Sequence, residues 1–373
     1  MYDVAVVGLG IMGSAAAYEI ARRGKQVVGL EQFARVHDRG SSHGETRAFR
    51  LAHFEGKHYS RLAQQALQGW RRLEGETGTR LLTTNGILEC GPEASEYVEK
   101  SIKAAKDNNL AFEELTSKEV GERYPAFQLP KRWRNVFHPG GGFLRPELAV
   151  HCFQTAAKKM GADLHFHRHV KAVEPKDDFL RIVTEGRPIR AKVAVITSGP
   201  WIGELVLPLA PYLTLTREVQ LWFKPVTPDL FTPERFPVFA LYDRDDLVYG
   251  FPDVAGSGVK SASHRRGREL PHAAAAQQDG SEEDATSVRR VISRHLSGLD
   301  SPVIRAETCI YTNTPDEAFI IDRSPEDERI VFASACSGHG FKYASVIGEI
   351  LADLALDGDT KHKIGEFRIS RFD

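Results

Sequence analysis

The pattern of apolar and polar residues at the start of the chain predicts a strand, a turn, a helix and a second strand, in that order. Residues 3–7 are a largely apolar run of the kind found in strands that are buried on both faces. A glycine-rich turn follows at 8–13, and residues 15–23 have helical spacing. Residues 26–31 have the pattern of a second strand, so the chain is predicted to begin with a βαβ unit.

Further along, the pattern alternates between helices and two groups of strands. Helical spacing occurs at 59–73, 93–108 and 146–160. Strands that would return to the first unit are predicted at 170–173, 180–183, 193–197 and 330–333. A separate antiparallel sheet is predicted from the strand patterns at 219–223, 238–241, 247–251 and 306–311. The chain is therefore expected to pass several times between two domains.

Length and charge narrow the class of protein. A chain of 373 residues exceeds the size at which one hydrophobic core usually stops growing, so two joined domains are expected. Its 49 basic and 50 acidic residues give a net charge of −1, which leaves no electrostatic signature of a nucleic-acid or membrane partner. A small-molecule partner is expected instead.

The cysteines and the first residues bear on the location of the protein. Four cysteines are too few and too scattered for a disulfide framework or a zinc site with paired ligands: Cys90, Cys152, Cys309 and Cys336. The start lacks the basic region of a secretory signal, and no apolar run approaches the roughly 18 residues of a membrane span. The sequence therefore predicts a cytoplasmic protein with no metal site and no membrane partner.

The first glycine-rich turn has the spacing GxGxxG. Gly8 allows a tight turn, Gly10 lets a pyrophosphate approach the backbone, and Gly13 lets the helix pack closely on the strand. The helix N-terminus adds amide groups and a partial positive charge for the phosphates. Glu31 ends the next strand, where its carboxylate would accept hydrogen bonds from ribose hydroxyls and repel a 2′-phosphate. This favours FAD or NAD over NADP; the alternative is a turn that binds no ligand.

The later part of the chain bears on the choice between FAD and NAD. An NAD domain is typically one continuous N-terminal block, whereas strand patterns return here at 194–198 and 330–333. A second glycine-rich turn at 337–342 opens onto another helical stretch, and Cys309 lies shortly before it. These features favour FAD. An NAD-dependent dehydrogenase and a non-catalytic nucleotide-binding module stay open as alternatives.

The expected fold is α/β, with an FAD-binding Rossmann-like domain interleaved with an antiparallel-sheet (α+β) substrate domain. The FAD-binding domain is predicted to comprise about 1–80, 146–215 and 315–373, and the substrate domain about 81–145 and 216–314. Residues 32–46, rich in glycine, serine, histidine and charge, cannot supply a core face and are expected to form a loop over the site.

Five motifs occur in order along the chain: RGSSHGETRAFR at 39–50, YGFP at 249–252, VKSASH at 259–264, CIY at 309–311 and SGHGFK at 337–342. With these motifs the chain resembles the monomeric sarcosine oxidase and N-methyltryptophan oxidase family, and the match spans essentially the whole sequence. The family consists of flavoproteins of the D-amino acid oxidase type. The resemblance implies a monomer that oxidises a secondary amino acid, with oxygen as the electron acceptor.

The resemblance assigns roles to three cations. It implies that Arg50 and Lys342 clamp the substrate carboxylate and that Arg47 lies close to the isoalloxazine ring. Arginine offers a planar fork for a carboxylate, and lysine adds a point charge. The alternative for Arg47 and Arg50 is a pair of solvated surface cations.

The resemblance also implies that Lys260 lies near flavin N5 and activates oxygen. Electron transfer to oxygen creates negative charge there, which a fixed cation stabilises. His264 would lie close by, on the substrate side. The alternatives are an ordinary surface lysine and a histidine that is merely a packing residue.

Cys309 matches the cysteine that, in the family, carries the flavin through a thioether to its 8α-methyl carbon. The resemblance therefore implies covalent FAD at this residue. Cys336 is a rival for the attachment, and the alternative for Cys309 itself is a small buried hydrophobe.

The remaining site residues come from the same comparison with the family. Tyr249, Tyr311 and His339 are expected around the substrate, because each has an apolar body and a polar tip. Gly338 and Gly340 would let the backbone approach the pyrimidine end of the flavin, before a helix whose N-terminal dipole stabilises its anionic reduced form. Further cofactor contacts are expected from Ile11, Met12, Gln32, Arg39, Ser42, His43, Thr46, Val170 and Phe341, in addition to Arg47 and Lys342.

Ala240 departs from the pattern of sarcosine-oxidising relatives, which hold a bulkier methionine at the matching position. The substrate is therefore expected to be sarcosine or a bulkier N-methyl amino acid such as N-methyltryptophan, with formaldehyde and hydrogen peroxide as products. An Amadori-compound (fructosyl amino acid) oxidase and a cyclic imino acid oxidase are the alternatives within the flavin class.

Overall fold

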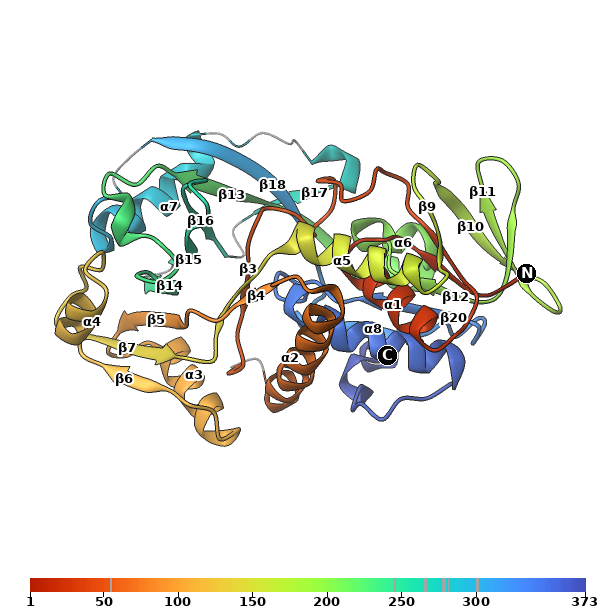
Figure 1. Ribbon diagram of the computed structural model, residues 1–373, viewed down its shortest axis with the longest axis horizontal. Coiled ribbons are helices and arrows are strands. Elements are labelled where there is room, and N and C mark those ends of the chain that lie inside the picture. Colours follow the sequence, from red (N-terminus) through yellow and green to blue (C-terminus); the bar gives the residue numbers. More distant parts are fainter. Residues whose placement is uncertain (54–55, 245, 265–266, 277–279, 281, 300–301) are drawn as a thin grey trace.

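The apolar run at the start of the chain is β1 (Tyr2–Val7), which lies inside a largely parallel sheet because its last four residues are buried on both faces. The computed structural model describes residues 1–53, 56–244, 246–264, 267–276, 280, 282–299 and 302–373 (Figure 1). Along this first sheet the order is β10 (Val170–Pro175), β11 (Leu180–Thr184), β12 (Ile189–Ile196), β1, β2 (Val27–Leu30) and β9 (Asp163–His165), with β20 (Ile330–Ser334) beside β12 and β19 (Ile320–Arg323) beside β20.

The strand pairing confirms the predicted βαβ unit. β1 pairs in parallel with both β2 and β12, and α1 (Ile11–Arg22) connects β1 to β2. α1 packs between α5 (Pro146–Lys159) and α8 (Ala344–Leu356), and α2 (Lys57–Thr77) lies beside α8 (Figure 1). A Cβ at Gly348 would lie 2.6 Å from the backbone of Ala15, so glycine is what lets α8 approach α1.

The second large sheet carries the strands that were expected to form a separate domain. Its order is β17 (Arg268–Leu270), β13 (Thr214–Phe223), β16 (Val259–Ser263), β15 (Asp246–Asp253), β14 (Val238–Asp243), β5 (Ile87–Pro92), β7 (Trp133–His138) and β6 (Glu113–Leu115), with β18 (Val303–Asn313) beside β13. α4 (Ser117–Arg123) and α7 (Glu282–His295) contribute to the core on one face, and α3 (Glu96–Asp107) covers part of the other.

The strands predicted for the second sheet pair antiparallel, and one strand that was not predicted, β5, adds a parallel pair. β14 runs parallel to β5, in the register Val238 to Ile87 through Leu241 to Cys90. A hairpin can join only antiparallel neighbours, and the chain between these two strands makes a long crossing through both sheets before it returns. The result is a mixed sheet whose strand ends converge on the first sheet.

The structure also contains a small third sheet and several short helices. The sheet contains β3 (Arg47–Phe49), β8 (Gly142–Leu144) and β4 (Leu82–Thr83), in that order. The short helices are α6 (Ile202–Leu205), η1 (Gly199–Trp201), η2 (Leu207–Tyr212), η3 (Pro228–Leu230), η4 (Ala273–Ala275), η5 (Phe341–Tyr343), η6 (Gly365–Phe367) and η7 (Ile369–Phe372).

The chain alternates between the two large sheets as expected. The first sheet takes its strands from residues 2–30, 163–196 and 320–334, and the second from 87–138 and 214–313. The predicted boundaries near 80, 145 and 314 fall between these segments, whereas the one near 215 falls within the first residues of β13; the division into domains stays a prediction. Among the helices that the structure describes, none combines the length and the apolar character needed to cross a membrane.

Candidate active site

One pocket lies where the two large sheets meet, and segments far apart in the sequence line it. Both glycine-rich turns contribute to its wall, as do the strands β13 to β16 and β18. Most residues predicted to contact cofactor or substrate line it: Gly8, Gly10, Ile11, Met12, Glu31, Gln32, Ser42, Thr46, Arg47, Arg50, Val170, Ala240, Tyr249, Lys260, His264, Cys309, Tyr311, Gly338, His339, Gly340, Phe341 and Lys342.

Three predicted cofactor contacts lie elsewhere in the structure. Arg39 is exposed, where water solvates its charge, and its nearest carboxylate is Asp38 at 3.6 Å. His43 is buried away from the pocket wall, with Nδ1 3.4 Å from Glu307 Oε2. Gly13 serves helix packing, because a Cβ there would lie 1.8 Å from the carbonyl oxygen of Gly8. The loop therefore presents only some of its residues to the pocket.

The first glycine-rich turn is built for close backbone approach. Gly8 has a φ of 88°, and a Cβ there would lie 2.6 Å from the carbonyl oxygen of Thr197. Glu31 Oε2 accepts a hydrogen bond from the Leu9 amide at 2.8 Å, which ties the end of β2 to the turn. Gly10 supplies no side-chain cap to α1, whose first turn also contains no acidic residue. The N-terminus of α1 is therefore suited to an anion.

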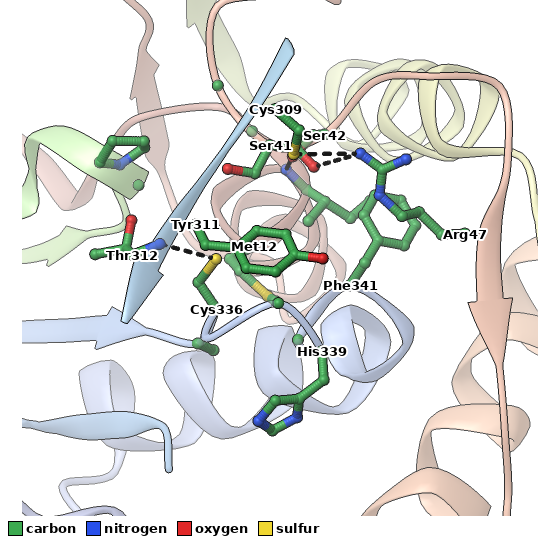
Figure 2. A pocket seen from close by; sticks show the side chains of 18 of the residues that line it. Met12, Ser41, Ser42, Arg47, Cys309, Tyr311, Thr312, Cys336, His339 and Phe341 are labelled. Carbon is green, nitrogen blue, oxygen red and sulfur yellow. Dashed lines mark hydrogen bonds between the residues drawn. The ribbon is translucent and has the colours of Figure 1, made fainter. Parts of the chain in front are cut away.

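The second glycine-rich turn packs beneath an aromatic ring. Gly338 has a φ of 76°, and a Cβ there would lie 2.3 Å from the ring of Tyr311. A Cβ at Gly340 would lie 1.7 Å from the carbonyl oxygen of Ala335. Only glycine fits these positions, so the backbone that leads into η5 and α8 lies against the pocket (Figure 2).

Arg47 extends from β3, not from a helix, and is buried at the centre of the site. Its guanidinium donates to Gln220 Oε1 at 2.9 Å and to the carbonyl oxygen of Ser41 at 3.1 Å. It also lies 3.7 Å from Cys309 Sγ (Figure 2). Burial raises the pKa of the Cys309 thiol, and the positive charge of Arg47 opposes that rise. The interpretation of Arg47 as a solvated surface cation is therefore wrong.

Cys336 also lines the pocket. Its Sγ accepts a hydrogen bond from the Thr312 amide at 3.4 Å (Figure 2), and burial raises the pKa of its thiol. Both cysteines thus line the pocket, and this alone does not separate them. The proximity of Arg47 distinguishes Cys309, because a cation favours the thiolate that attacks carbon.

Lys260 is a buried residue of β16 and not a surface lysine. Its ammonium donates to the carbonyl oxygens of Gly44 and Thr46, both at 2.7 Å. The Phe251 ring centroid lies 4.8 Å from the same nitrogen. Burial, followed by repulsion from Arg47, holds the pKa of Lys260 well below its usual range.

Two tyrosines and a histidine form the aromatic part of the wall. Tyr311 Oη lies 3.4 Å from His264 Nδ1, and the ring centroids of Tyr249 and His264 lie 6.3 Å apart. Burial raises the pKa of Tyr249 to about 12, so its hydroxyl stays protonated. These side chains can exclude water from the pocket while keeping polar tips inside it.

The two residues of the predicted carboxylate clamp, Arg50 and Lys342, each bind a different partner. Arg50 Nη1 donates to Glu89 Oε1 at 3.1 Å, and Glu89 is only 1% exposed. Burial raises the pKa of Glu89, but His138, whose Nε2 lies 3.6 Å from Glu89 Oε2, and the charge of Arg50 have the larger opposite effect and lower the pKa to about 2. Lys342 is buried and donates to the carbonyl oxygen of His339.

His339 is placed mainly by packing. Its Nε2 lies 3.0 Å from the carbonyl oxygen of Glu317, and its ring stacks on Phe319 at 4.7 Å between centroids. It lines the edge of the pocket, from the turn that also carries Lys342 (Figure 2).

Comparisons with known proteins identify the class of ligand. The family model described as FAD dependent oxidoreductase matches residues 3–354. The chain belongs to this family. The match decides between FAD and NAD in favour of FAD, and it confirms the interpretation of the chain as an oxidoreductase.

Full-length relatives and solved structures support the same assignment. Monomeric sarcosine oxidase of Bacillus sp. (strain B-0618) is 33% identical, over 99% of this chain and 96% of the relative. N-methyl-L-tryptophan oxidase of Yersinia pestis (strain Pestoides F) is 35% identical, over 100% and 99%. NikD, an amino acid oxidase of nikkomycin biosynthesis, has a TM-score of 0.87 at 24% identity, over 98% and 97%. Amadoriase I of Aspergillus fumigatus has a TM-score of 0.82 at 19%, over 98% and 89%. The two structures show the fold, and the predicted family is confirmed by the two relatives.

The pocket of this FAD-dependent oxidoreductase fits a large polar cofactor. Buried side-chain atoms along its wall have no hydrogen-bond partner among the described residues: Thr46 Oγ1, Ser198 Oγ, Gln220 Nε2 and Thr312 Oγ1. Buried polar atoms are rarely left unpaired, so these four indicate a ligand with several hydrogen-bonding groups. Together with the two glycine-rich turns, they match the chemistry of FAD.

Sequence reasoning missed several residues of the site. Glu89 pairs with Arg50, Gln220 pairs with Arg47, and residues 197–201 also line the pocket. Glu89 carries a sequence signal, because it is an isolated acid within the otherwise apolar run of residues 87–90. Gln220 carries none, since polar residues at alternate strand positions usually face solvent.

Proposed function

We propose that this protein oxidises N-methyl amino acids. A secondary amine R–NH–CH3, oxygen and water give R–NH2, formaldehyde and hydrogen peroxide. The observation that supports the proposal most is the convergence of cations in one pocket between the two glycine-rich turns: the buried Lys260 and Lys342 and the partly buried Arg50. The relatives at full length are named as oxidases of sarcosine and of N-methyl-L-tryptophan.

Each group then has a role set by its position. Bound FAD would accept a hydride equivalent from the N-methyl carbon and deliver two electrons to oxygen. Arg50 and Lys342 bind the substrate carboxylate and orient the neutral amine, while Tyr249 and Tyr311 exclude water. The Lys260 ammonium stabilises the negative charge that develops as oxygen takes up electrons, and burial strengthens this interaction.

We also propose a thioether between Cys309 and the FAD. The buried thiol lies beside Arg47 in the pocket, which supports this attachment over one at Cys336. Acid precipitation tests it. Flavin should stay with the pellet of the native protein and of Cys336→Ala but be released from Cys309→Ala, and colour that remains with the Cys309→Ala pellet would place the linkage elsewhere.

The pocket next to Ala240 supports a substrate larger than sarcosine. Ala240 lines the wall opposite Tyr249 on the neighbouring strand, where a methionine would fill part of the pocket. The proposed range therefore includes sarcosine and bulkier N-methyl amino acids such as N-methyltryptophan. The structural similarity to amadoriase shows only a shared fold, so the Amadori-compound and cyclic imino acid oxidases remain the weaker alternatives.

Three further parts of the proposal concern the protein in solution. We propose oxygen as the physiological acceptor, a monomer as the active form and the cytoplasm as the location. The name of the sarcosine oxidase relatives supports the monomer.

A substrate panel tests the proposed function directly. The purified protein should bleach in the flavin band when N-methyl amino acids are added without oxygen, and it should form peroxide when air is admitted. Sarcosine, N-methyltryptophan, a fructosyl amino acid and proline are compared at equal concentration. Reduction by the last two alone would replace the proposal with an alternative, and failure to hold a flavin would remove it altogether.

A further inference from the structure

The turn that holds Lys260 contains a residue in a strained conformation. Gly44 and Glu45 are consecutive left-handed residues, with φ values of 98° and 62°. Glycine adopts this region freely, but in a residue with a Cβ the side chain comes too close to the following carbonyl oxygen, so the conformation is strained. Such strain persists where the surroundings over-determine it, and it clusters at functional sites. Glu45 has no role in the proposed chemistry so far.

The Glu45 side chain is anchored in the substrate domain by three donors. Its Oε2 accepts from Trp222 Nε1 at 3.1 Å and from Ser257 Oγ at 2.8 Å, and its Oε1 accepts from Arg305. Burial alone would raise the pKa of Glu45, but the three donors have the larger, opposite effect. The pKa is therefore below its usual value, and the carboxylate is ionised. The residues that hold it come from β13, from the segment before β16 and from β18.

A second carboxylate holds the backbone of the same turn. Glu147 Oε1 accepts hydrogen bonds from the amides of Gly44 and Glu45, the second at 3.0 Å. With its amides bound by Glu147, the turn directs the carbonyl oxygens of Gly44 and Thr46 to the Lys260 ammonium at 2.7 Å. A Cβ at Gly44 would lie 2.3 Å from Gln220 Oε1, so the turn has no room to shift in that direction.

Trp222 links the Glu45 anchor to Lys260 by a second route. The Arg305 guanidinium lies 3.9 Å from the centroid of the Trp222 ring, and Lys260 Nζ lies 5.5 Å from the same centroid. Glu45 binds both the indole nitrogen and Arg305. The position of the ring that borders the ammonium therefore depends on the same carboxylate as the position of the carbonyls.

We propose that Glu45 is a positioning residue for oxygen activation. Its anchored carboxylate keeps the left-handed turn in place, and the two carbonyls of the turn use two of the three ammonium hydrogens of Lys260. The direction of the third is thereby fixed towards the pocket. This inference rests on the proposed role of Lys260 in the oxygen reaction, and it does not depend on which amine is the substrate.

Two variants separate the side chain from the backbone strain. Glu45→Gln keeps the length of the side chain and loses its charge, whereas Glu45→Gly relieves the left-handed strain and removes all three anchors. Glu317→Gln is the matched control, because Glu317 is an exposed acid with a similar φ of 59°. Lys260→Met, alone and combined with Glu45→Gly, completes the set.

The measurement is the reaction of the reduced holoenzyme with oxygen in a stopped-flow instrument. Reduction with dithionite makes the result independent of the amine, and anaerobic reduction by an N-methyl amino acid is followed separately. We expect Glu45→Gly to slow the oxygen reaction about 10- to 100-fold, because small displacements of a positioned group have effects of this size. Glu45→Gln should fall between the wild type and Glu45→Gly, and the amine-driven step should change less than about twofold in both.

Two further results complete the test. The Trp222 emission should shift in both Glu45 variants and not in Glu317→Gln, with Trp222→Phe identifying the signal. Glu45→Gly should add no further slowing to Lys260→Met. The inference is overturned if Glu45→Gln and Glu45→Gly react with oxygen as the wild type does, if both half-reactions slow equally, or if the effects of Glu45→Gly and Lys260→Met multiply. An absence of amine-driven reduction in the wild type would instead count against the proposed function alone.

Discussion

Arg50 and Lys260, two of the cations that line the pocket, differ in the charge of their partners. Arg50 is paired with the ionised carboxylate of Glu89, whereas Lys260 is held by the uncharged carbonyl oxygens of Gly44 and Thr46. Burial without a counter-ion lowers the pKa of Lys260, while Glu89 keeps a pKa of about 2 beside Arg50. A compensated cation is suited to fix the geometry of a substrate, and an uncompensated one to respond to negative charge that appears during the reaction.

Removing Arg50 should have the largest effect, because the buried carboxylate of Glu89 then loses its arginine partner. We expect Arg50→Met to lower the free energy of unfolding by about 3–5 kcal/mol. Addition of Glu89→Gln to this variant should restore most of the loss, since the buried charge is then gone. Urea unfolding measures both. Arg134→Met, which breaks the exposed ion pair with Glu114, is the control and should cost at most about 1 kcal/mol.

The pH dependence of stability follows from the same pair. The pKa of Glu89 is lowered in the folded state, so its stabilising contribution is present above its unfolded pKa of about 4.3. That contribution is lost only as the pH falls towards 2. The prediction is contradicted if the wild type and Glu89→Gln lose the same stability in acid. It is also contradicted if Arg50→Met and Arg134→Met have the same free energy of unfolding.

The backbone features of the site could be predicted from the sequence, because they depend on local geometry. The glycines at 8 and 13 and at 338 and 340 occupy positions where a Cβ would collide, and the βαβ pattern places the first turn correctly. The positions of Lys260 and Cys309 were predicted only through the family resemblance. The glycine turns, Lys260 and Cys309 were all predicted from sequence motifs and not from the amino-acid composition.

The residues that hold the cations could not be predicted, because their partners are distant in sequence. Glu89 is 39 positions from Arg50, and Glu147 is 103 positions from the Gly44 amide that it binds. The exposed position of Arg39 could not be predicted either, and its contact with the cofactor stays a prediction. The loop carries residues that face both solvent and pocket, and neither hydrophobic periodicity nor charge distinguishes the two sides.

Removing the uncompensated cation should affect one half-reaction. We expect Lys260→Met to slow reoxidation of the reduced enzyme by oxygen on the order of 10²- to 10³-fold, the usual cost of losing a preorganised group that stabilises developing charge. Anaerobic reduction by substrate should be largely intact. Stopped-flow absorbance separates the two steps, and Lys224→Met, at an exposed lysine after β13, is the control. Equal loss in both steps would contradict the assignment.

The lowered pKa of Lys260 predicts that the rate of the oxygen reaction depends on pH, with an effect of intermediate size. The oxygen reaction should slow as the pH rises through that pKa, because the ammonium loses its charge, and the rate should be about tenfold lower one pH unit above it. The midpoint should lie below the ordinary lysine value of 10.5. Stability should rise over the same range, since the unfolded chain then binds more protons than the folded one. A falling limb that persists in Lys260→Met would assign it to another group.

The smallest effect concerns the room beside the compensated cation. Ala240 lies in register with Glu89 on one neighbouring strand and with Tyr249 on the other, so a larger side chain there would extend into the substrate end of the pocket. We expect Ala240→Met to lower kcat/KM for N-methyltryptophan relative to sarcosine by about tenfold, the usual range for crowding by one or two methylene groups. The oxygen reaction should not change, because Lys260 lies two strands away on β16. Steady-state kinetics with both amines measure the ratio, and Ala94→Met, at an exposed alanine, is the control. The opposite result would be an unchanged kcat/KM ratio together with a slower oxygen reaction. The two ends of the pocket would then not be independent, and Arg50 and Lys260 would not divide substrate binding from oxygen chemistry between them.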